Sequence, residues 1–85
     1  METRVAVMSI IVVNMDSVEP LNALLHGSGK YIIGRMGIPY KEKKINVLSV
    51  AVDAPQDVIS SLSGKIGKLD GISVKTAYSN VISEK

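Results

Sequence analysis

One pattern occurs twice in the chain, forty residues apart, and this repeat limits the possible folds more than any other feature. Val-Met-Ser-Ile-Ile-Val-Val at residues 7–13 returns as Val-Leu-Ser-Val-Ala-Val-Asp at residues 47–53. The same offset relates three further pairs: Val18 and Val58, Gly27 and Gly67, and Ile32 and Ile72. Each copy reads as an apolar strand, a helix and a second strand. The repeat therefore predicts the element order β-α-β-β-α-β.

The boundaries of these elements follow from local signals. β-branched and apolar runs predict strands over residues 5–13, 31–40, 45–52 and 72–78. Helical stripes of leucine, isoleucine and valine lie between them, and glycine ends each stripe. The Lys-Glu-Lys-Lys run that follows the second strand predicts a solvated hairpin turn. Residues 80–85 are expected to form a loose tail.

This order is that of the ferredoxin-like fold, an α+β architecture. Because crossovers between parallel strands are right-handed, the first and third strands lie in the middle of a four-stranded antiparallel sheet with strand order 4-1-3-2. Both helices then cover one face of that sheet. The residue pattern agrees, since the first and third strands are the most apolar ones. All 85 residues are expected to form a single domain.

Composition restricts the classes of function. The chain has no cysteine and one histidine, His26, so we expect neither a metal site nor a cofactor. Ten basic and eight acidic residues leave a net charge of +2, which is too weak to predict direct nucleic-acid binding. No segment is long and apolar enough to predict a membrane span. The absence of cysteine fits a cytoplasmic protein, and no pairing of a nucleophile with a base suggests an enzyme.

Residue parity separates the two faces of the central strands. Even-numbered residues such as Met8 and Val50 are bulky and suit the face that the helices cover. The odd-numbered residues face the other way, and most of them are apolar. We take as representatives of this open face Val7, Ser9, Ile11, Val47 and Ser49. A bare face of that composition is a large apolar patch, so we expect a second copy of the chain to cover it, in a homodimer or homotetramer. The alternative is that the tail or a loop folds over it.

Residues 34–40, Gly-Arg-Met-Gly-Ile-Pro-Tyr, have the features of a binding site. Gly34 and Gly37 lie inside a strand, where glycine costs stability and often marks a bulge or the close approach of a ligand or another chain. Arg35 is expected between them on the open face, where a guanidinium can bind a carboxylate or phosphate bidentately. Tyr40 closes the stretch. The alternative is that Arg35 forms an ion pair with a neighbouring subunit and that the glycines allow tight contact between strands.

Residues 31–44 and 64–75 resemble the regulators of the iron-only hydrogenase system. These are small ACT-like proteins, related in fold to the C-terminal domain of nickel-responsive repressors. The resemblance runs from about residue 4 to residue 79, and Ile-Gly-Arg-Met-Gly-Ile-Pro-Tyr at residues 33–40 is its most specific part. It implies an ACT-like domain that forms dimers or tetramers through its sheet. It also implies a role in sensing or regulation connected with hydrogenase expression or assembly.

Two departures limit what the resemblance implies. Nickel-responsive regulators use a cluster of histidine and cysteine, which this composition does not offer. ACT domains that bind ligands often have glycine between the first strand and the first helix, where this chain has Asn14-Met15-Asp16. The side chain of Asn14 still offers polar contacts, so it is a weaker candidate for ligand binding.

These observations predict a non-catalytic regulatory domain that binds a small effector or a regulatory partner protein. The alternative is a structural or assembly protein that acts through self-association and partner binding without a small ligand. No DNA-reading element precedes the domain, so direct operator binding is not expected.

Overall fold

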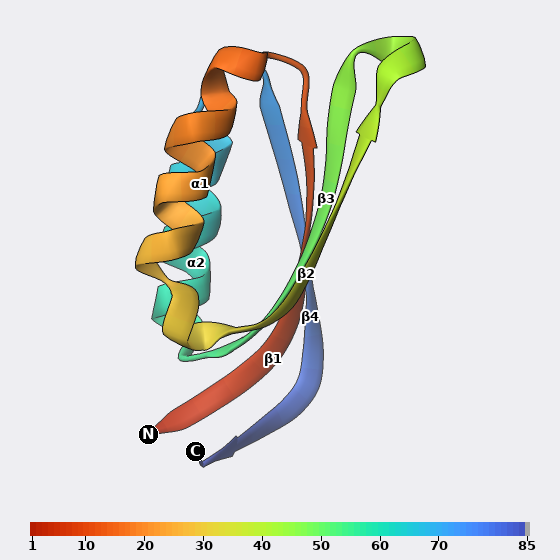
Figure 1. Cartoon of the computed structure of the whole chain (residues 1–85). Coiled ribbons are helices and arrows are strands. Elements are labelled where there is room, and N and C mark those ends of the chain that lie inside the picture. Colours follow the sequence, from red (N-terminus) through yellow and green to blue (C-terminus); the bar gives the residue numbers. More distant parts are fainter. Residues whose placement is uncertain (85) are drawn as a thin grey trace.

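The computed structural model describes residues 1–84 and consists of a four-stranded antiparallel sheet with both helices on one face (Figure 1). The strands are β1 (Glu2–Val12), β2 (Ile32–Tyr40), β3 (Ile45–Ala54) and β4 (Ile72–Glu84). The helices are α1 (Val18–Gly27) and α2 (Gln56–Gly67). The strand order is β2-β3-β1-β4, which confirms the ferredoxin-like fold and the order 4-1-3-2. Among the described residues, neither helix is long and apolar enough to cross a membrane.

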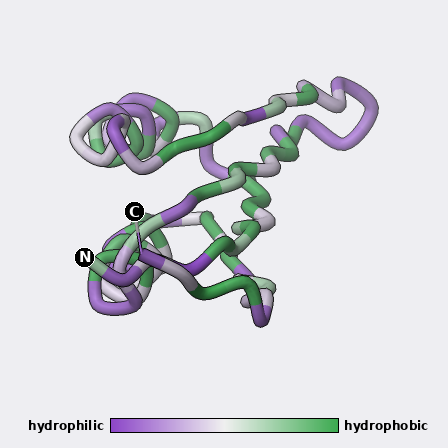
Figure 2. Tube along the Cα trace, turned by 90° about the horizontal axis from the view of Figure 1, so that it is seen from below, coloured by the Kyte–Doolittle hydropathy of each residue, from purple (hydrophilic) through white to green (hydrophobic). Residues whose placement is uncertain are grey.

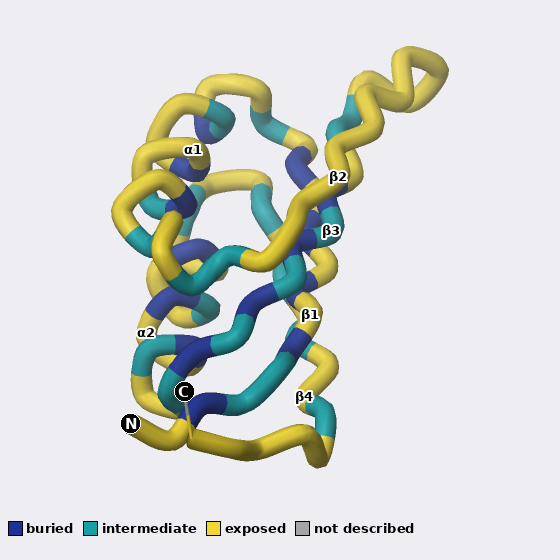
Figure 3. The backbone as a smooth tube through the Cα atoms, turned by 60° about the horizontal axis from the view of Figure 1, so that its bottom comes forward, coloured by how far each residue is buried: buried dark blue, intermediate teal, exposed yellow. Residues whose placement is uncertain are grey.

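The hydrophobic core lies between the sheet and the helices (Figure 3). Even-numbered side chains of the two central strands point into it, because successive residues of a strand alternate between faces. Each helix adds a buried stripe at helical spacing, namely Leu21 and Leu25 from α1 and Ile59, Leu62 and Ile66 from α2. The strand residues of the core are Ala6, Met8, Ile10, Val12, Leu48, Val50, Val52 and Ala54.

The repeat in the sequence appears in the structure as a pseudo-two-fold symmetry. Ser9 of β1 pairs with Ser49 of β3, and these two serines are forty residues apart. A two-fold rotation about this pair therefore exchanges the two halves of the chain. Under it, the pair of Met8 with Val50 becomes the pair of Ile10 with Leu48.

The ends of β2 and β3 extend away from the helices as a hairpin arm, which we define as residues 36–48 (Figures 1 and 3). The 3-10 turn Lys41–Lys43 closes the arm, and Lys44 follows it with a left-handed φ of 55°. Figure 2 shows the tip as a hydrophilic loop far from the helices. The expected solvated turn is therefore confirmed.

The opposite end of the sheet corrects the expectation of a loose tail over residues 80–85. There β4 continues to Glu84 and pairs with the beginning of β1, with Thr3 opposite Ser83. The amino group of Met1 also lies 3.0 Å from Oε1 of Glu84. Residues 80–84 are ordered as strand because the backbone of β1 offers them a partner. The last residue of the expected tail, Lys85, lies outside the described residues.

The turn before β4 is fixed by close contact with the end of β1. The backbone amide of Val13 donates to the carbonyl of Gly71 at 2.7 Å. Gly71 has φ +68°, and a Cβ at this position would lie 2.5 Å from the Cβ of Asn14. Glycine is needed here both for the left-handed backbone and for the space.

Replacing Gly71 with alanine should therefore lower the free energy of unfolding by about 2 kcal/mol or more, through the left-handed backbone and the clash with Asn14. Gly64→Ala is the matched control, since Gly64 lies inside α2 and a Cβ there has no neighbour within 4 Å. That change should raise stability by about 0.5–1 kcal/mol. Urea denaturation followed by circular dichroism measures both. Equal stability of Gly71→Ala and the parent chain would contradict this account of the turn.

Candidate functional site

The position of Arg35 depends on a β-bulge in β2. Ile32 pairs with Val52 of β3, but Gly34 pairs with Ala51, so Ile33 is one extra residue on the β2 side. An extra residue exchanges the faces to which all later side chains of that strand point. Arg35 consequently lies opposite the buried Val50 and points toward the helices. The expectation that Arg35 lies on the open face is wrong.

The second copy of the repeat shows what the bulge changes. Ile72 of β4 pairs with Val12 of β1 just as Ile32 pairs with Val52. From there β4 runs without a bulge as far as Tyr78, so Lys75 lies opposite Ser9 on the open face. Lys75 occupies the position in the repeat that corresponds to Arg35. The single extra residue therefore sends the two cations to opposite faces of the sheet.

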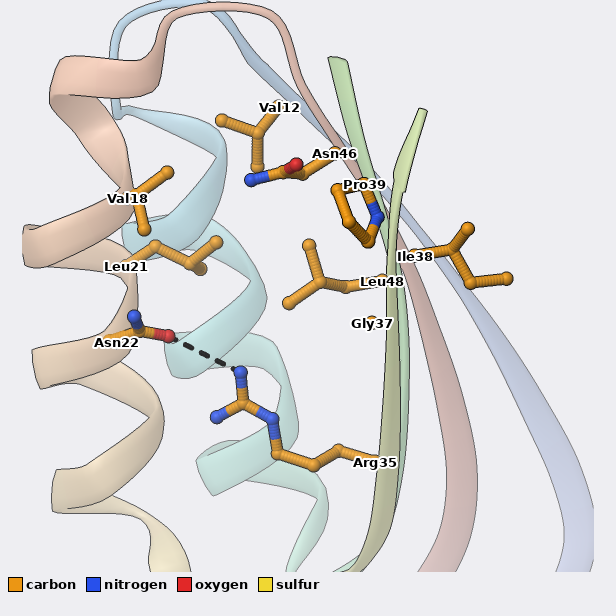
Figure 4. A pocket seen from close by; sticks show the side chains of 10 residues that line it. All are labelled: Val12, Val18, Leu21, Asn22, Arg35, Gly37, Ile38, Pro39, Asn46 and Leu48. Atoms are coloured by element: carbon orange, nitrogen blue, oxygen red, sulfur yellow. Dashed lines mark hydrogen bonds between the residues drawn. The ribbon is translucent and has the colours of Figure 1, made fainter. Parts of the chain in front are cut away.

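Arg35 reaches into a pocket of about 230 Å³ between α1 and the hairpin arm (Figure 4). The walls are largely apolar, and Figure 4 shows the Arg35 side chain extending from β2 toward α1. Two amides complete the polar part of the lining, Asn22 from α1 and Asn46 from β3. The other lining residues are Val12, Val18, Leu21, Gly37, Ile38, Pro39 and Leu48.

The guanidinium of Arg35 forms a hydrogen bond with a neutral partner. Its Nη2 donates to Oδ1 of Asn22 at 3.2 Å. Within residues 1–84, no carboxylate lies within ion-pairing distance of the Arg35 guanidinium. A guanidinium has five N–H donors, so this contact leaves donors for an anion in the pocket.

The two glycines of β2 have different surroundings. Gly37 lies opposite Leu48 and lines the pocket, and a Cβ there would stand 3.8 Å from Cγ of Leu48. The missing side chain of Gly37 therefore keeps part of the pocket free. Gly34 lies opposite Ala51 on the open face, with no atom within 4 Å of the Cβ position.

Two of the other candidates lie outside this pocket. Tyr40 pairs with Ile45 on the open side of the arm, and its hydroxyl donates to Oε2 of Glu42 at 3.0 Å. Asn14 donates from Nδ2 to Oδ2 of Asp70 at 2.7 Å, and its Oδ1 accepts from the backbone amide of Asp16 at 3.0 Å. The nitrogen and the oxygen of the Asn14 side chain thus both form hydrogen bonds within the turns between strands and helices, as in a helix cap.

Sequence reasoning missed Asn22 and Asn46. A signal for Asn46 was present, because it is a polar residue at an even position of β3, where Leu48, Val50 and Val52 are apolar. Nothing comparable marked Asn22, because an asparagine beside a leucine stripe is equally typical of a solvent-facing helix position.

The open face of the single chain is exposed. Val7 lies opposite Ala51, Ser9 opposite Ser49, and Ile11 opposite Val47. The exposed fractions of Val7, Ile11 and Val47 are 36%, 40% and 37%. The arm extends this surface with Met36, Ile38 and Tyr40. Within residues 1–84 the tail does not fold over it, because β4 stays in the sheet (Figure 1).

The pocket is lined by apolar residues, two amides and one guanidinium. Its lining includes no serine, cysteine, histidine, lysine, aspartate or glutamate, so it offers neither a nucleophile nor a general base. Across the described part of the chain, no three His, Cys, Asp or Glu side chains gather where they could hold a metal ion.

Two comparisons place the chain in a family. A model of the TM1266-like family, described as "Iron-only hydrogenase system regulator, putative", matches residues 4–76. The solved structure of the uncharacterized protein TM1266 from Thermotoga maritima is 30% identical and has a TM-score of 0.86. That similarity covers 89% of this chain and 96% of the Thermotoga chain.

More distant structures share the fold alone. A formyltetrahydrofolate deformylase from Pseudomonas putida KT2440 has a TM-score of 0.66 at 11% identity, over 91% of this chain and 29% of that one. The apo form of CPII from Thiomonas intermedia K12, a nitrogen regulatory PII-like protein, has a TM-score of 0.56 at 13% identity, over 99% and 98% of the two chains. No curated protein matches the chain.

Proposed function

We propose that this chain, which belongs to the TM1266-like family, is a regulatory module without catalytic activity that binds a small effector through Arg35. The family connects it with the iron-only hydrogenase system. The observation that carries the proposal is the bulge at Ile33. It directs the Arg35 side chain toward a largely apolar pocket, where its hydrogen-bond partner is a neutral amide. Bulges often re-aim a side chain beside a functional site.

The position of the pocket suggests how binding regulates. Arg35 and Gly37 face the pocket, whereas the side chains of Met36 and Ile38 face the open side of the same arm. Ile38 also lines the pocket, but Figure 4 shows its side chain pointing away from α1. A ligand that contacts both α1 and the arm would hold the arm against α1. The arm would then present its open face in one orientation, so that effector binding and association of that face are coupled in free energy.

Removal of the guanidinium should weaken effector binding roughly ten- to hundred-fold, because a hydrogen bond to a charged group contributes about 1.5–3 kcal/mol. Native mass spectrometry of freshly purified protein should show extra mass that is released by mild activation, and Arg35→Ala should lose it. Gly37→Val should lose it too, because the new side chain enters the pocket.

Gly34→Val is the matched control for the pocket, since it adds the same side chain to the same strand on the opposite face. It should retain the bound mass. If the bound mass persists unchanged in Arg35→Ala, the effector role of this pocket is refuted.

A second function, assembly through self-association, is supported by the open face. The Ser9–Ser49 pair lies at the centre of this face, and the pseudo-two-fold axis runs through that pair. Exposed apolar side chains flank it on both sides. Such a surface suits a homodimer or homotetramer, since a two-fold interface uses the same patch on both subunits. In this function Arg35 has a structural role and no ligand is needed.

Ile11→Lys should shift the sedimentation coefficient from that of an oligomer to that of a monomer, because a charge buried between two apolar faces is strongly unfavourable. Ala23→Lys adds the same charge on the exposed part of α1 and should leave the oligomer intact. Sedimentation velocity at micromolar concentration distinguishes the two results. A parent chain that sediments as a monomer argues against assembly through this face.

A further inference from the structure

The pocket at Arg35 has a polar end and an apolar part, and both restrict its ligand. The polar end is one guanidinium, with no lysine or second arginine in the lining. A phosphate dianion is usually held by several cations or backbone amides. Here one N–H of a single arginine already donates to Asn22. The remaining N–H groups match one planar carboxylate.

The apolar part is formed by side chains from the sheet and from α1. Val12 and Leu48 come from the central strands, Val18 and Leu21 from α1, and Pro39 from the arm. The volume of about 230 Å³ is below the range of about 300–1,000 Å³ typical of drug-sized ligands. The pocket therefore suits a small ligand, such as an acid with about five or six carbons.

The lining also discriminates against an amino group. None of its residues is acidic, and Oδ1 of Asn22 already accepts from Arg35. An ammonium group beside the bound carboxylate would therefore gain no charged partner, and it would lie near the like charge of Arg35.

The end of the sheet where β1 begins also has a pocket, of about 250 Å³, and there side chains of the protein contact one another. Arg4 of β1 donates from Nη1 to Oε1 of Gln56, at the start of α2, at 3.0 Å. The guanidinium of Arg4 also lies 5.7 Å from the centre of the Tyr78 ring. Side chains thus connect that end of the sheet to α2. Between α1 and the hairpin arm, the Arg35–Asn22 hydrogen bond leaves the pocket open.

From these observations we infer that the Arg35 pocket takes a short aliphatic monocarboxylic acid that lacks an amino group. This inference rests on the proposed effector-binding function and specifies its ligand class. The carboxylate would lie on the free donors of Arg35, and the branched or linear tail would lie against Leu21 and Leu48.

Titration of the ¹⁵N-labelled protein with 4-methylpentanoate, followed by NMR, tests the inference. We expect saturable shifts of the Asn22, Gly37 and Asn46 resonances. Uncharged 4-methylpentanamide, the amino acid leucine and inorganic phosphate should each bind at least ten-fold more weakly. Arg35→Gln should weaken binding of the acid at least ten-fold while its spectrum keeps the dispersion of a folded protein, and Arg35→Lys should bind with intermediate affinity.

Equal affinity for the amide or for leucine, or unchanged affinity of Arg35→Gln for the acid, would overturn the assignment of the ligand class. Native mass spectrometry distinguishes a wrong ligand class from a wrong proposed function. An Arg35-dependent bound mass of another chemical kind would refute the acid and retain the effector site. Absence of both the mass and the NMR shifts would refute both.

Discussion

The antiparallel pairing of β1 with β3 is the constraint on which the rest of the structure depends. Ser9 opposite Ser49 fixes the register, and a register fixes which side chains share a face. With this register the even-numbered residues of both strands meet under the helices and the odd-numbered residues meet on the other face. A shift of one residue would turn Ser9 of β1, or Ser49 and Asp53 of β3, toward the core. The core and the open face are therefore two results of one pairing.

The bulge in β2 is a departure from the internal symmetry of the fold, and the candidate site is built on it. Without Ile33 as an extra residue, the side chain of Arg35 would lie on the open face, as that of Lys75 does. With it, one strand presents Arg35 and Gly37 to a pocket and Met36 and Ile38 to the opposite surface. The arm consequently connects the proposed site for a small molecule with the proposed surface for a second copy of the chain. This connection fits a regulator better than it fits a purely structural domain.

The sequence was sufficient for the fold because the repeat, the strand parity and the helical stripes all indicate the same arrangement. Glycines beside a cation in a strand are unusual, and this pattern drew attention to Arg35 and Gly37, which line the pocket. The sequence-based prediction placed Arg35 on the wrong face because parity was counted along β2 without the extra residue, although glycine inside this strand had indicated a possible bulge. The partners Asn22 and Asn46 come from distant segments, and their convergence depends on packing. The strand at residues 80–84 was missed because its pairing with β1 joins opposite ends of the sequence.

The central claim is that Arg35 points toward α1 and away from the open face. Nuclear Overhauser effects of the Arg35 side chain in the ligand-free protein test it directly. The account predicts contacts between the side-chain protons of Arg35 and those of Asn22, as the hydrogen bond at 3.2 Å requires. Contacts of Arg35 with Val47 or Ser49 instead, and none with Asn22, would contradict it, because they would place the guanidinium on the open face and leave the pocket without its charge.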